Sequence, residues 1–471
     1  MGSGYLNLIK ENKKYFWLWF GLTLSLLGDW FNQIATITMC QNINKSGLML
    51  SILFVAKTLP SFVLIPIVGP VADKFNKNIV MILSDLIRAC VVLVFIVVEY
   101  VKIEWFLFSI VFIQFSISSF FTPARTGLIS FVVNAKQIVE ANTLDATTWS
   151  TMFFIGGSIG GVVTSVTGLT PAYIIDSISY IISATCIIIS WKFTKLTSSL
   201  QKSDSKEITD KKQTEQKSED SNKEDIQTIS NSSDDDINDE NALLKSNLKE
   251  EKQEEPLNTN FKGGLVFLKK NPQVLFMVIV KTTGALVWGA VDVTMVSIVE
   301  KYFQIKGKVG ISLGIMYATE GLGTLIGPIV GQRFAKDTFK SRWLTIFIGF
   351  LIFLFGTIFI GVGVYFENFE VFLVSNFVRT FGIGLLWVWS TILIQITPPG
   401  HFVGRMFSFD YGFFYLILML SYLWGGFCMG TLNYSFMKIF YIQTCLGIFV
   451  ILFWMIYVIK IFKTKKTKRN Q

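Results

Sequence analysis

Long apolar stretches, separated by short polar segments, recur along most of the chain. Most of these stretches contain about 20 residues, the length that an α-helix needs to cross a hydrocarbon layer of about 30 Å. The pattern therefore predicts an all-α membrane protein with about twelve transmembrane helices. The expected spans are 16–40, 48–71, 79–99, 104–122, 144–167, 172–191, 273–297, 309–332, 343–365, 370–395, 407–431 and 438–460.

A polar segment interrupts this pattern at residues 192–260. Lys, Glu, Asp, Ser, Asn and Gln dominate it, so it carries too little apolar surface to form a core, and we expect a disordered cytoplasmic linker. The linker separates an N-terminal six-helix bundle (1–191) from a C-terminal six-helix bundle (261–471). The C-terminal part is expected to begin with a short amphipathic helix at 261–272 and to end in a basic cytoplasmic tail.

Composition and charge refine this topology. Hydrophobic residues make up 51% of the 471 residues. Lys and Arg number 18 in the short loops and both termini on one side and 6 in the loops on the other, so the positive-inside rule predicts cytoplasmic termini. The net charge of +9 then reflects topology, and we expect no nucleic-acid partner. We expect a multi-pass protein, surrounded by lipid, that functions as a monomer in the plasma membrane or an organelle membrane.

Residue types that carry cofactor and metal chemistry are scarce. His401 is the single histidine, which argues against a histidine-based metal site, and the five cysteines have no metal-ligand spacing. The sequence has no Walker A loop of the kind found in ATP-driven pumps. We therefore expect no enzyme activity, no cofactor and no metal.

Related sequences close equivalent spans in the two halves. "LIPIVGPVADKF" ends the second span and "LIGPIVGQRFAKDTF" ends the eighth, while "TPAR" after the fourth span is similar to "TPPGHFVGR" after the tenth. Such a repeat predicts two six-helix halves of related architecture.

The loop after the second span resembles the signature loop of the major facilitator superfamily. Gly69 permits a close approach of two helix ends, and Asp73 is placed to meet a helix N-terminus or a cation. The resemblance implies a cytoplasmic latch between the two halves. Its expected members are Gly69, Asp73, Lys74, Lys77, Arg125 and Arg405.

Further motifs narrow the resemblance to one branch of that superfamily. "LGDWFNQIA", "SDLIRA", "FFTPARTGLISFVV", "EANTLDATT" and "AYIIDSISYIISA" are similar to the branch that contains the enterobactin exporter and macrolide efflux proteins. The resemblance implies alternating access, in which the two halves rock around a site at the membrane midplane. It also implies export of the cargo.

Charged residues within apolar spans are costly and usually face a cavity or a partner. Asp29 lies near the middle of the first span and Glu320 near the middle of the eighth, so both are candidates for carrying a coupled proton. A structural role for Asp29, within a Gly-Asp-Trp element bonded to a neighbouring helix, is an open alternative. Asp85 and Arg88 stand three residues apart, which favours an ion pair on one helix face.

The superfamily resemblance also implies that spans one, four, seven and ten line the central cavity. The candidates for substrate contacts on these spans, besides Asp29, are Gln114, Lys281, Trp288, Asp292 and Arg379. We expect a secondary active transporter that exports a small organic solute against protons. The alternative is a transporter-like receptor or scaffold that no longer transports and acts through its cytoplasmic linker.

Overall fold

The computed structural model describes residues 8–134, 137–193, 261–334 and 338–467, and this part of the chain contains helices and no strand. The first group of helices comprises α2 (Lys13–Ile43), α3 (Gly47–Val63), α4 (Ile65–Lys74), α5 (Lys77–Val101), α6 (Glu104–Val132), α7 (Ile138–Thr167) and an unlabelled helix, Leu169–Phe193. The second group comprises α10 (Phe261–Lys270), α11 (Pro272–Val278), α12 (Val280–Tyr302), α13 (Val309–Phe334), α14 (Phe339–Tyr365), α15 (Phe369–Ile396), α16 (Gly400–Gly430) and α17 (Phe436–Thr467). The expected linker lies outside the described residues, except for the last two residues of the helix Leu169–Phe193.

Ten of the described helices are long and apolar enough to cross a membrane. Their surfaces are arranged for contact with lipid, as α5 illustrates. Leu83 and Ile87 are about half exposed, whereas Asp85 and Arg88 on the same helix are buried. Lipid tolerates exposed apolar side chains, while a charged side chain needs a partner inside the protein. The predicted all-α membrane fold is confirmed.

Two expected spans are interrupted by a non-helical residue. In the second span, α3 ends at Val63 and α4 begins at Ile65, with Pro66 in the first turn of α4. Proline has no N–H to donate and its ring crowds the preceding turn, which accounts for a break at this position. In the seventh span, α11 and α12 are separated at Ile279.

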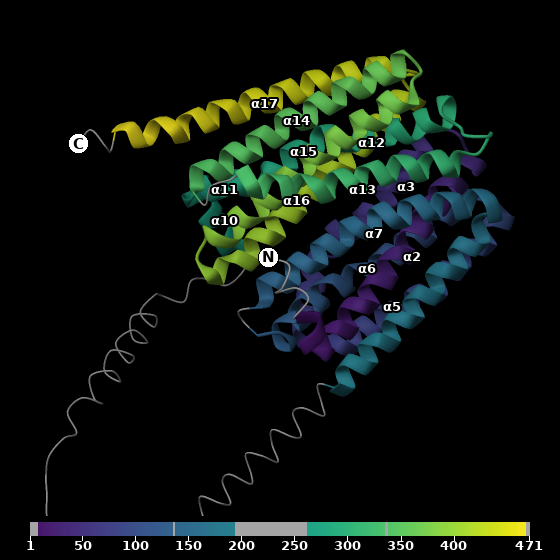
Figure 1. The fold of residues 1–471 in the computed structure, drawn as a ribbon, viewed down its shortest axis with the longest axis horizontal. Helices are drawn as coiled ribbons and strands as arrows, with labels where there is room; N and C mark the ends of the chain where they lie inside the picture. Colours follow the sequence, from purple (N-terminus) through teal and green to yellow (C-terminus); the bar gives the residue numbers. More distant parts are fainter. Residues whose placement is uncertain (1–7, 135–136, 194–260, 335–337, 468–471) are drawn as a thin grey trace, which may run out of the picture. The chain divides into compact units, whose positions relative to one another are not determined.

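The helices of the first group run side by side in Figure 1, as do α12 to α17 of the second group. Within the first group, α2 packs on α7 and α5 on α6, and within the second, α14 packs on α15 and α12 on α16. Residues 1–191 and 273–471 together form one compact unit. The helix α10 belongs to a separate unit.

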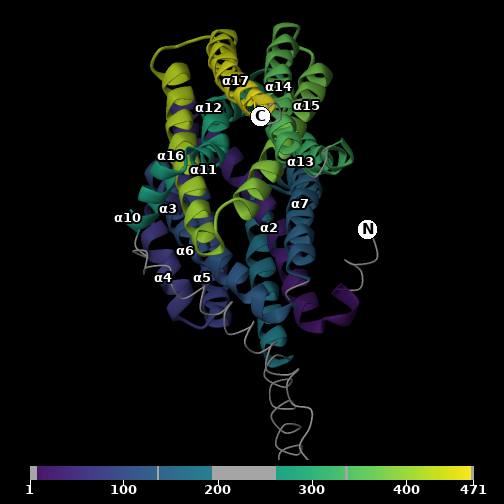
Figure 2. The same ribbon diagram turned by 90° about the vertical axis from the view of Figure 1, so that its left-hand side faces the viewer.

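The two groups meet along two helix pairs, α7 with α13 and α3 with α16 (Figures 1 and 2). Glycine makes the first approach possible, because a Cβ atom on Gly161 of α7 would lie 2.6 Å from the Cα of Gly314 on α13. At the second pair, Ser51 of α3 is completely buried next to Gly426 of α16. All four residues lie in the halves of their helices that are nearest to the loops expected on the outer side of the membrane.

Candidate functional site

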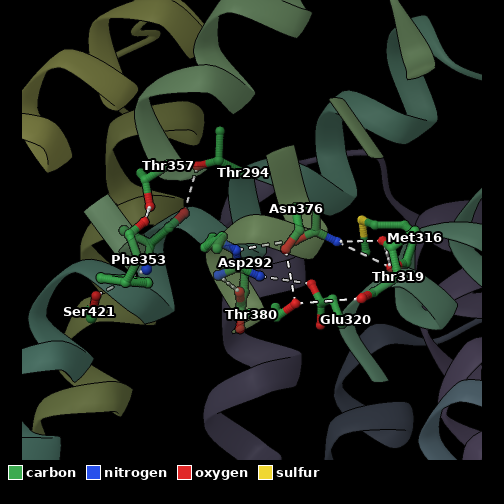
Figure 3. A network of polar contacts seen from close by, with 12 residues as sticks. Asp292, Thr294, Met316, Thr319, Glu320, Phe353, Thr357, Asn376, Thr380 and Ser421 are labelled. Carbon is green, nitrogen blue, oxygen red and sulfur yellow. Dashed lines mark hydrogen bonds and ion pairs between the residues drawn. The ribbon is translucent and has the colours of Figure 1, made fainter. Parts of the chain in front are cut away.

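Three charged side chains from three helices meet inside the second group of helices. Arg379 of α15 donates from Nη1 to Oδ1 of Asp292 on α12 and from Nη2 to Oε1 of Glu320 on α13, both at 2.8 Å. The Arg379 side chain is completely buried, while 18% of the Asp292 side chain and 9% of the Glu320 side chain remain exposed. One guanidinium is therefore shared between two carboxyl groups, each of which keeps a small exposed area. Figure 3 shows Asp292 and Glu320 converging from their two helices.

Asn376, one turn before Arg379 on α15, holds the guanidinium in place. Its Oδ1 accepts from Nε of Arg379 at 3.1 Å. Its Nδ2 donates to the carbonyl of Met316 at 3.1 Å and to Oγ1 of Thr319 at 3.0 Å (Figure 3). The amide thus uses both ends to join α15 to α13. This fixes the orientation of Arg379 toward both acids.

The cluster lies one helical turn from the contact between the two groups of helices. Tyr317, three residues before Glu320 on α13, contacts Trp30 of α2 and Phe153 of α7, with ring centroids 6.0 and 6.1 Å apart. Trp30 and Phe153 stack face to face with centroids 3.8 Å apart. A change at Glu320 therefore has a short structural route to the first group of helices.

A second buried polar network lies within the first group of helices. The hydroxyl of Tyr180 donates to Oδ1 of Asp29, and Arg88 forms an ion pair with Asp85. The Arg88 guanidinium also lies 4.2 Å from the centroid of the Tyr180 ring and interacts electrostatically with Asp29. Asp29 and Glu320 thus belong to different networks, and the partners of Asp29 lie within the first group of helices.

Asp176 completes this second network. It is fully buried on the helix Leu169–Phe193, and its Oδ2 accepts from Nδ2 of Asn32 on α2 at 2.7 Å. The carboxyl groups of Asp29 and Asp176 interact electrostatically, as do Asp176 and Arg88. The network joins α2, α5 and the helix Leu169–Phe193 through polar groups that lipid does not solvate.

The other cavity candidates take different positions. Lys281 of α12 forms an ion pair with Asp410 of α16, and both side chains are completely buried. Trp288 packs against Trp387 and Phe414, with ring centroids 6.3 and 5.7 Å apart. Gln114 is buried on α6. Lys281 and Asp292, which share α12, are therefore paired with charges on two different helices.

Two of the expected latch residues, Arg125 and Lys77, contact residues of their own group of helices. Arg125 on α6 donates from Nη2 to both carboxylate oxygens of Asp145 on α7 at 2.8 Å and from Nη1 to the carbonyl of Leu18 on α2 at 2.9 Å. Lys77 lies 5.3 Å from the centroid of the Phe131 ring. Arg125 thus fastens three helix ends of the first group together.

The rest of the predicted latch is less connected. The Arg405 guanidinium lies 4.9 Å from the centroid of the Phe402 ring, and Lys74 is exposed. Asn76, in the same loop as Lys74, caps the N-terminus of α5 by accepting from the backbone N–H of Asn78 at 3.0 Å. The side chains of Gly69 and Asp73 lie outside the described residues.

Comparison with known proteins identifies the family. The sequence model described as "Major Facilitator Superfamily" matches residues 18–336. The chain belongs to the major facilitator superfamily. The predicted family is therefore confirmed, and the chain is a multi-pass membrane transporter of that superfamily.

Several relatives of this major facilitator protein come from bacteria. It is 23% identical to the MFS-type transporter YfiS of Bacillus subtilis (strain 168), over 85% of this chain and 83% of YfiS. It is 24% identical to macrolide efflux protein A of Streptococcus pyogenes, over 37% of this chain and 44% of that protein. It is also 24% identical to the putative bacilysin exporter BacE of Bacillus subtilis (strain 168), over 37% of this chain and 43% of BacE. The predicted resemblance to the efflux branch agrees with these matches.

Solved structures share the fold of this major facilitator protein. A bacterial homologue of the iron transporter ferroportin in an inward-facing state matches with a TM-score of 0.62 at 10% identity, over 94% of this chain and 98% of the other. A POT family transporter in complex with 5-aminolevulinic acid matches with a TM-score of 0.62 at 12% identity, over 95% of this chain and 96% of the other. At these identities the likeness concerns the fold.

Among the polar residues of these networks that sequence reasoning missed in this major facilitator protein are Asp176, Asp410 and Asn376. Asp176 and Asp410 are buried acids, and Asn376 orients Arg379. Asp176 interrupts an apolar run, so the cost of an intramembrane charge was a signal that could have identified it. Asp410 stands close to the expected start of the eleventh span, where a charge is unremarkable. Asn376 gives no such signal, because an uncharged amide in an apolar span is common.

Proposed function

We propose that this transporter is a secondary active exporter that moves a small organic solute out of the cytoplasm in exchange for protons. The observation that carries the proposal is the sharing of Arg379 between Asp292 and Glu320. Arginine keeps its positive charge in proteins, so the cluster is balanced when one of the two acids is ionised and the other holds a proton.

The charge balance gives the cluster two states of different stability. With both acids ionised, it carries one uncompensated negative charge inside the membrane, which is costly. A bound proton on Asp292 or Glu320 removes that uncompensated charge. Residual exposure of Asp292 and Glu320 supports proton exchange with water, whereas the completely buried Arg379 stays in place.

The position of the cluster supports coupling to alternating access. Glu320 shares α13 with Gly314 and Tyr317, which contact α7 and α2 of the other half. Protonation at Glu320 therefore acts on the helix that forms the main contact between the halves. A ligand shifts such an equilibrium when it interacts differently with the two states, and a proton on Glu320 meets this condition.

The direction of transport rests on three supporting observations. The positive-inside bias favours cytoplasmic termini. With that orientation, the close contacts at Gly161, Gly314 and Ser51 close the outer side, which is the state in which an exporter takes up cargo from the cytoplasm. Relatives over part of the chain are named as a macrolide efflux protein and a putative bacilysin exporter.

Transport by the full-length protein in liposomes tests the proposal. A panel of organic solutes is followed with and without an imposed pH gradient. We expect gradient-driven movement of at least one solute, and its loss by about tenfold or more in Glu320→Gln, which keeps the shape of the side chain but does not titrate. Glu370→Gln is the matched control, because Glu370 is an exposed acid at the start of α15. Unchanged pH-driven transport in well-folded Glu320→Gln would remove Glu320 from the mechanism.

A further inference from the structure

The Lys281 and Asp410 pair has the surroundings of an ammonium-binding site. Two aromatic rings flank the Lys281 ammonium, with Nζ 4.7 Å from the centroid of Trp387 and 5.2 Å from that of Tyr411. Aromatic faces attract cations, most strongly when water is excluded, and both charged side chains here are completely buried. A carboxylate and two rings thus enclose one positive charge, which in this structure belongs to the protein itself.

The carboxylate retains unused hydrogen-bonding capacity. Oδ2 of Asp410 accepts from Lys281, while its Oδ1 is buried and accepts no hydrogen bond from the described residues. A buried polar atom without a partner is unfavourable, and an ionised carboxylate can accept several hydrogen bonds. An ammonium group that approaches Asp410 would find an acceptor already oriented into a cage of aromatic rings.

A small cavity adjoins Lys281 and Trp387. Lys281, Gly284, Trp288, Trp387 and Phe414 are among its lining residues. Trp387 and Tyr411 are only partly buried, so the cage is not sealed by its aromatic members. Lysine has a flexible four-carbon stem, which lets its ammonium move away when another cation takes its place.

We propose that Asp410, Trp387 and Tyr411 form a binding site for the ammonium group of a hydrophobic amine, and that Lys281 occupies this site as an internal substitute when no cargo is bound. The substrate class is therefore an organic cation with an aromatic or aliphatic body, which would pack beside Trp288 in the space that Lys281 leaves when it moves away. This inference rests on the proposed transport function and names its cargo. It places the cargo charge in the second group of helices, apart from the proton cluster at Arg379.

Competition between Lys281 and the cargo sets the expected behaviour of the site. An arriving ammonium replaces one charge of the same sign, so Asp410 remains neutralised throughout. Neutral molecules of the same shape gain neither the ion pair nor the cation–π attraction. The site consequently selects charge, and Lys281 lowers the apparent affinity for every amine.

Equilibrium binding to the purified full-length protein tests this selection. Titration calorimetry compares tryptamine, at a pH where its amine is charged, with indole-3-ethanol, its neutral analogue of similar shape. We expect the wild type to bind tryptamine roughly tenfold more tightly than indole-3-ethanol. In Asp410→Asn that advantage disappears.

Lys281→Met removes the internal competitor while keeping most of the stem. We expect tryptamine binding to tighten by about tenfold in this variant. We also expect tryptamine to raise its melting temperature by more than indole-3-ethanol does, because the amine repairs the unpaired Asp410. Lys301→Met is the matched control, since Lys301 lies on the same helix over the rings of Tyr302 and Phe436 but is exposed. It should leave both affinities unchanged.

The binding measurement needs no gradient, so its outcome is separate from that of the transport assay. An Asp410-dependent preference for tryptamine supports the site even if liposomes show no proton-driven transport. Equal binding of tryptamine and indole-3-ethanol by the wild type overturns the proposed amine site. This holds even if the liposome assay shows proton-driven transport of another solute. Lys281→Met leaves Asp410 unpaired and so could prevent folding. The double variant Lys281→Met with Asp410→Asn leaves no unpaired charge and takes its place. The preference for tryptamine over indole-3-ethanol is then compared between this double variant and the wild type.

Discussion

Nη2 of Arg379 lies 2.8 Å from Oε1 of Glu320. Arg379 is the only basic residue of α15, and Glu320 is the only acidic residue of α13. The second arm of the guanidinium is tied to Asp292. A single buried charge thus connects α12, α13 and α15. Removal of one member changes the charge of the whole cluster, and the variants described next use that property.

Removal of Arg379 should destabilise the protein. Arg379→Met leaves Asp292 and Glu320 close together without a cation, and loss of one partner from a buried ion pair typically costs about 3–5 kcal/mol. We expect a lower melting temperature of the purified protein. The triple variant Arg379→Met with Asp292→Asn and Glu320→Gln carries no charge in the cluster, and most of the loss should be recovered. If the single and triple variants melt at the same temperature, charge balance does not determine the stability of this cluster.

Hydropathy alone was sufficient to predict the helices, because a membrane imposes length and apolarity on each spanning segment. The same rule does not specify partners between helices. Lys281 and Asp292 stand three turns apart on α12 and were both expected to contact substrate in the central cavity, yet Lys281 pairs with α16 and Asp292 with α15. These partners depend on how the helices pack, and spacing along one helix does not encode that.

Local spacing is informative where both partners share a helix. Asp85 and Arg88 stand three residues apart, and the structure places them in an ion pair. Arg125, by contrast, was expected in the latch between the two halves without a named partner, and its partner Asp145 lies 20 residues away on α7. Short-range pairs are therefore accessible from sequence, while the three-helix cluster at Arg379 needs the fold.

The role of Asp29 can be separated from that of Glu320. Asp29 accepts from Tyr180 and interacts with Arg88, so its surroundings favour a structural role. We expect Asp29→Asn to lower the free energy of unfolding by about 1–3 kcal/mol, because a charge-assisted interaction is lost. Transport per folded molecule should still respond to the pH gradient. Tyr180→Phe, which removes the hydroxyl donor, should show a similar loss of stability.

Gradient-driven transport decides between the two acids. A well-folded Asp29→Asn protein that has lost its response to the pH gradient would contradict the structural role of Asp29. Yield of folded protein is measured by size-exclusion chromatography, and transport is normalised to that yield. This comparison distinguishes a folding defect from an uncoupled transporter.

Cysteine labelling tests the orientation of the chain. Lys74 and Glu370 are both exposed, and the expected topology places Lys74 on the cytoplasmic side and Glu370 on the outer side. Each residue is replaced by Cys in a protein whose five native cysteines are changed to Ser. A membrane-impermeant maleimide should label Glu370→Cys in intact cells. It should label Lys74→Cys only after permeabilisation. The reverse pattern would place the termini on the outer side and would turn the proposed export into import.

The contact between α7 and α13 should tolerate no additional carbon atom at Gly161. A Cβ at this position would lie 2.5 Å from the carbonyl oxygen of Gly310, and backbone atoms have little freedom to move away. Gly161→Ala should therefore separate the two halves at this end, even though alanine is favoured over glycine within a helix by about 1 kcal/mol. Gly404→Ala on α16 is the control, because a Cβ there has no neighbouring atom within 4 Å.

Accessibility of the other helix pair reports on that separation. Ser51 is completely buried on α3, and Ser51→Cys in the cysteine-free protein should react slowly with the impermeant maleimide. Adding Gly161→Ala should increase the labelling rate by roughly tenfold, since α3 and α16 part together with α7 and α13 when the halves rock as rigid bodies. Adding Gly404→Ala should leave the rate unchanged. Equal labelling rates with Gly161→Ala and Gly404→Ala would mean that the two helix pairs do not open together, and that the halves do not move as rigid bodies at this end.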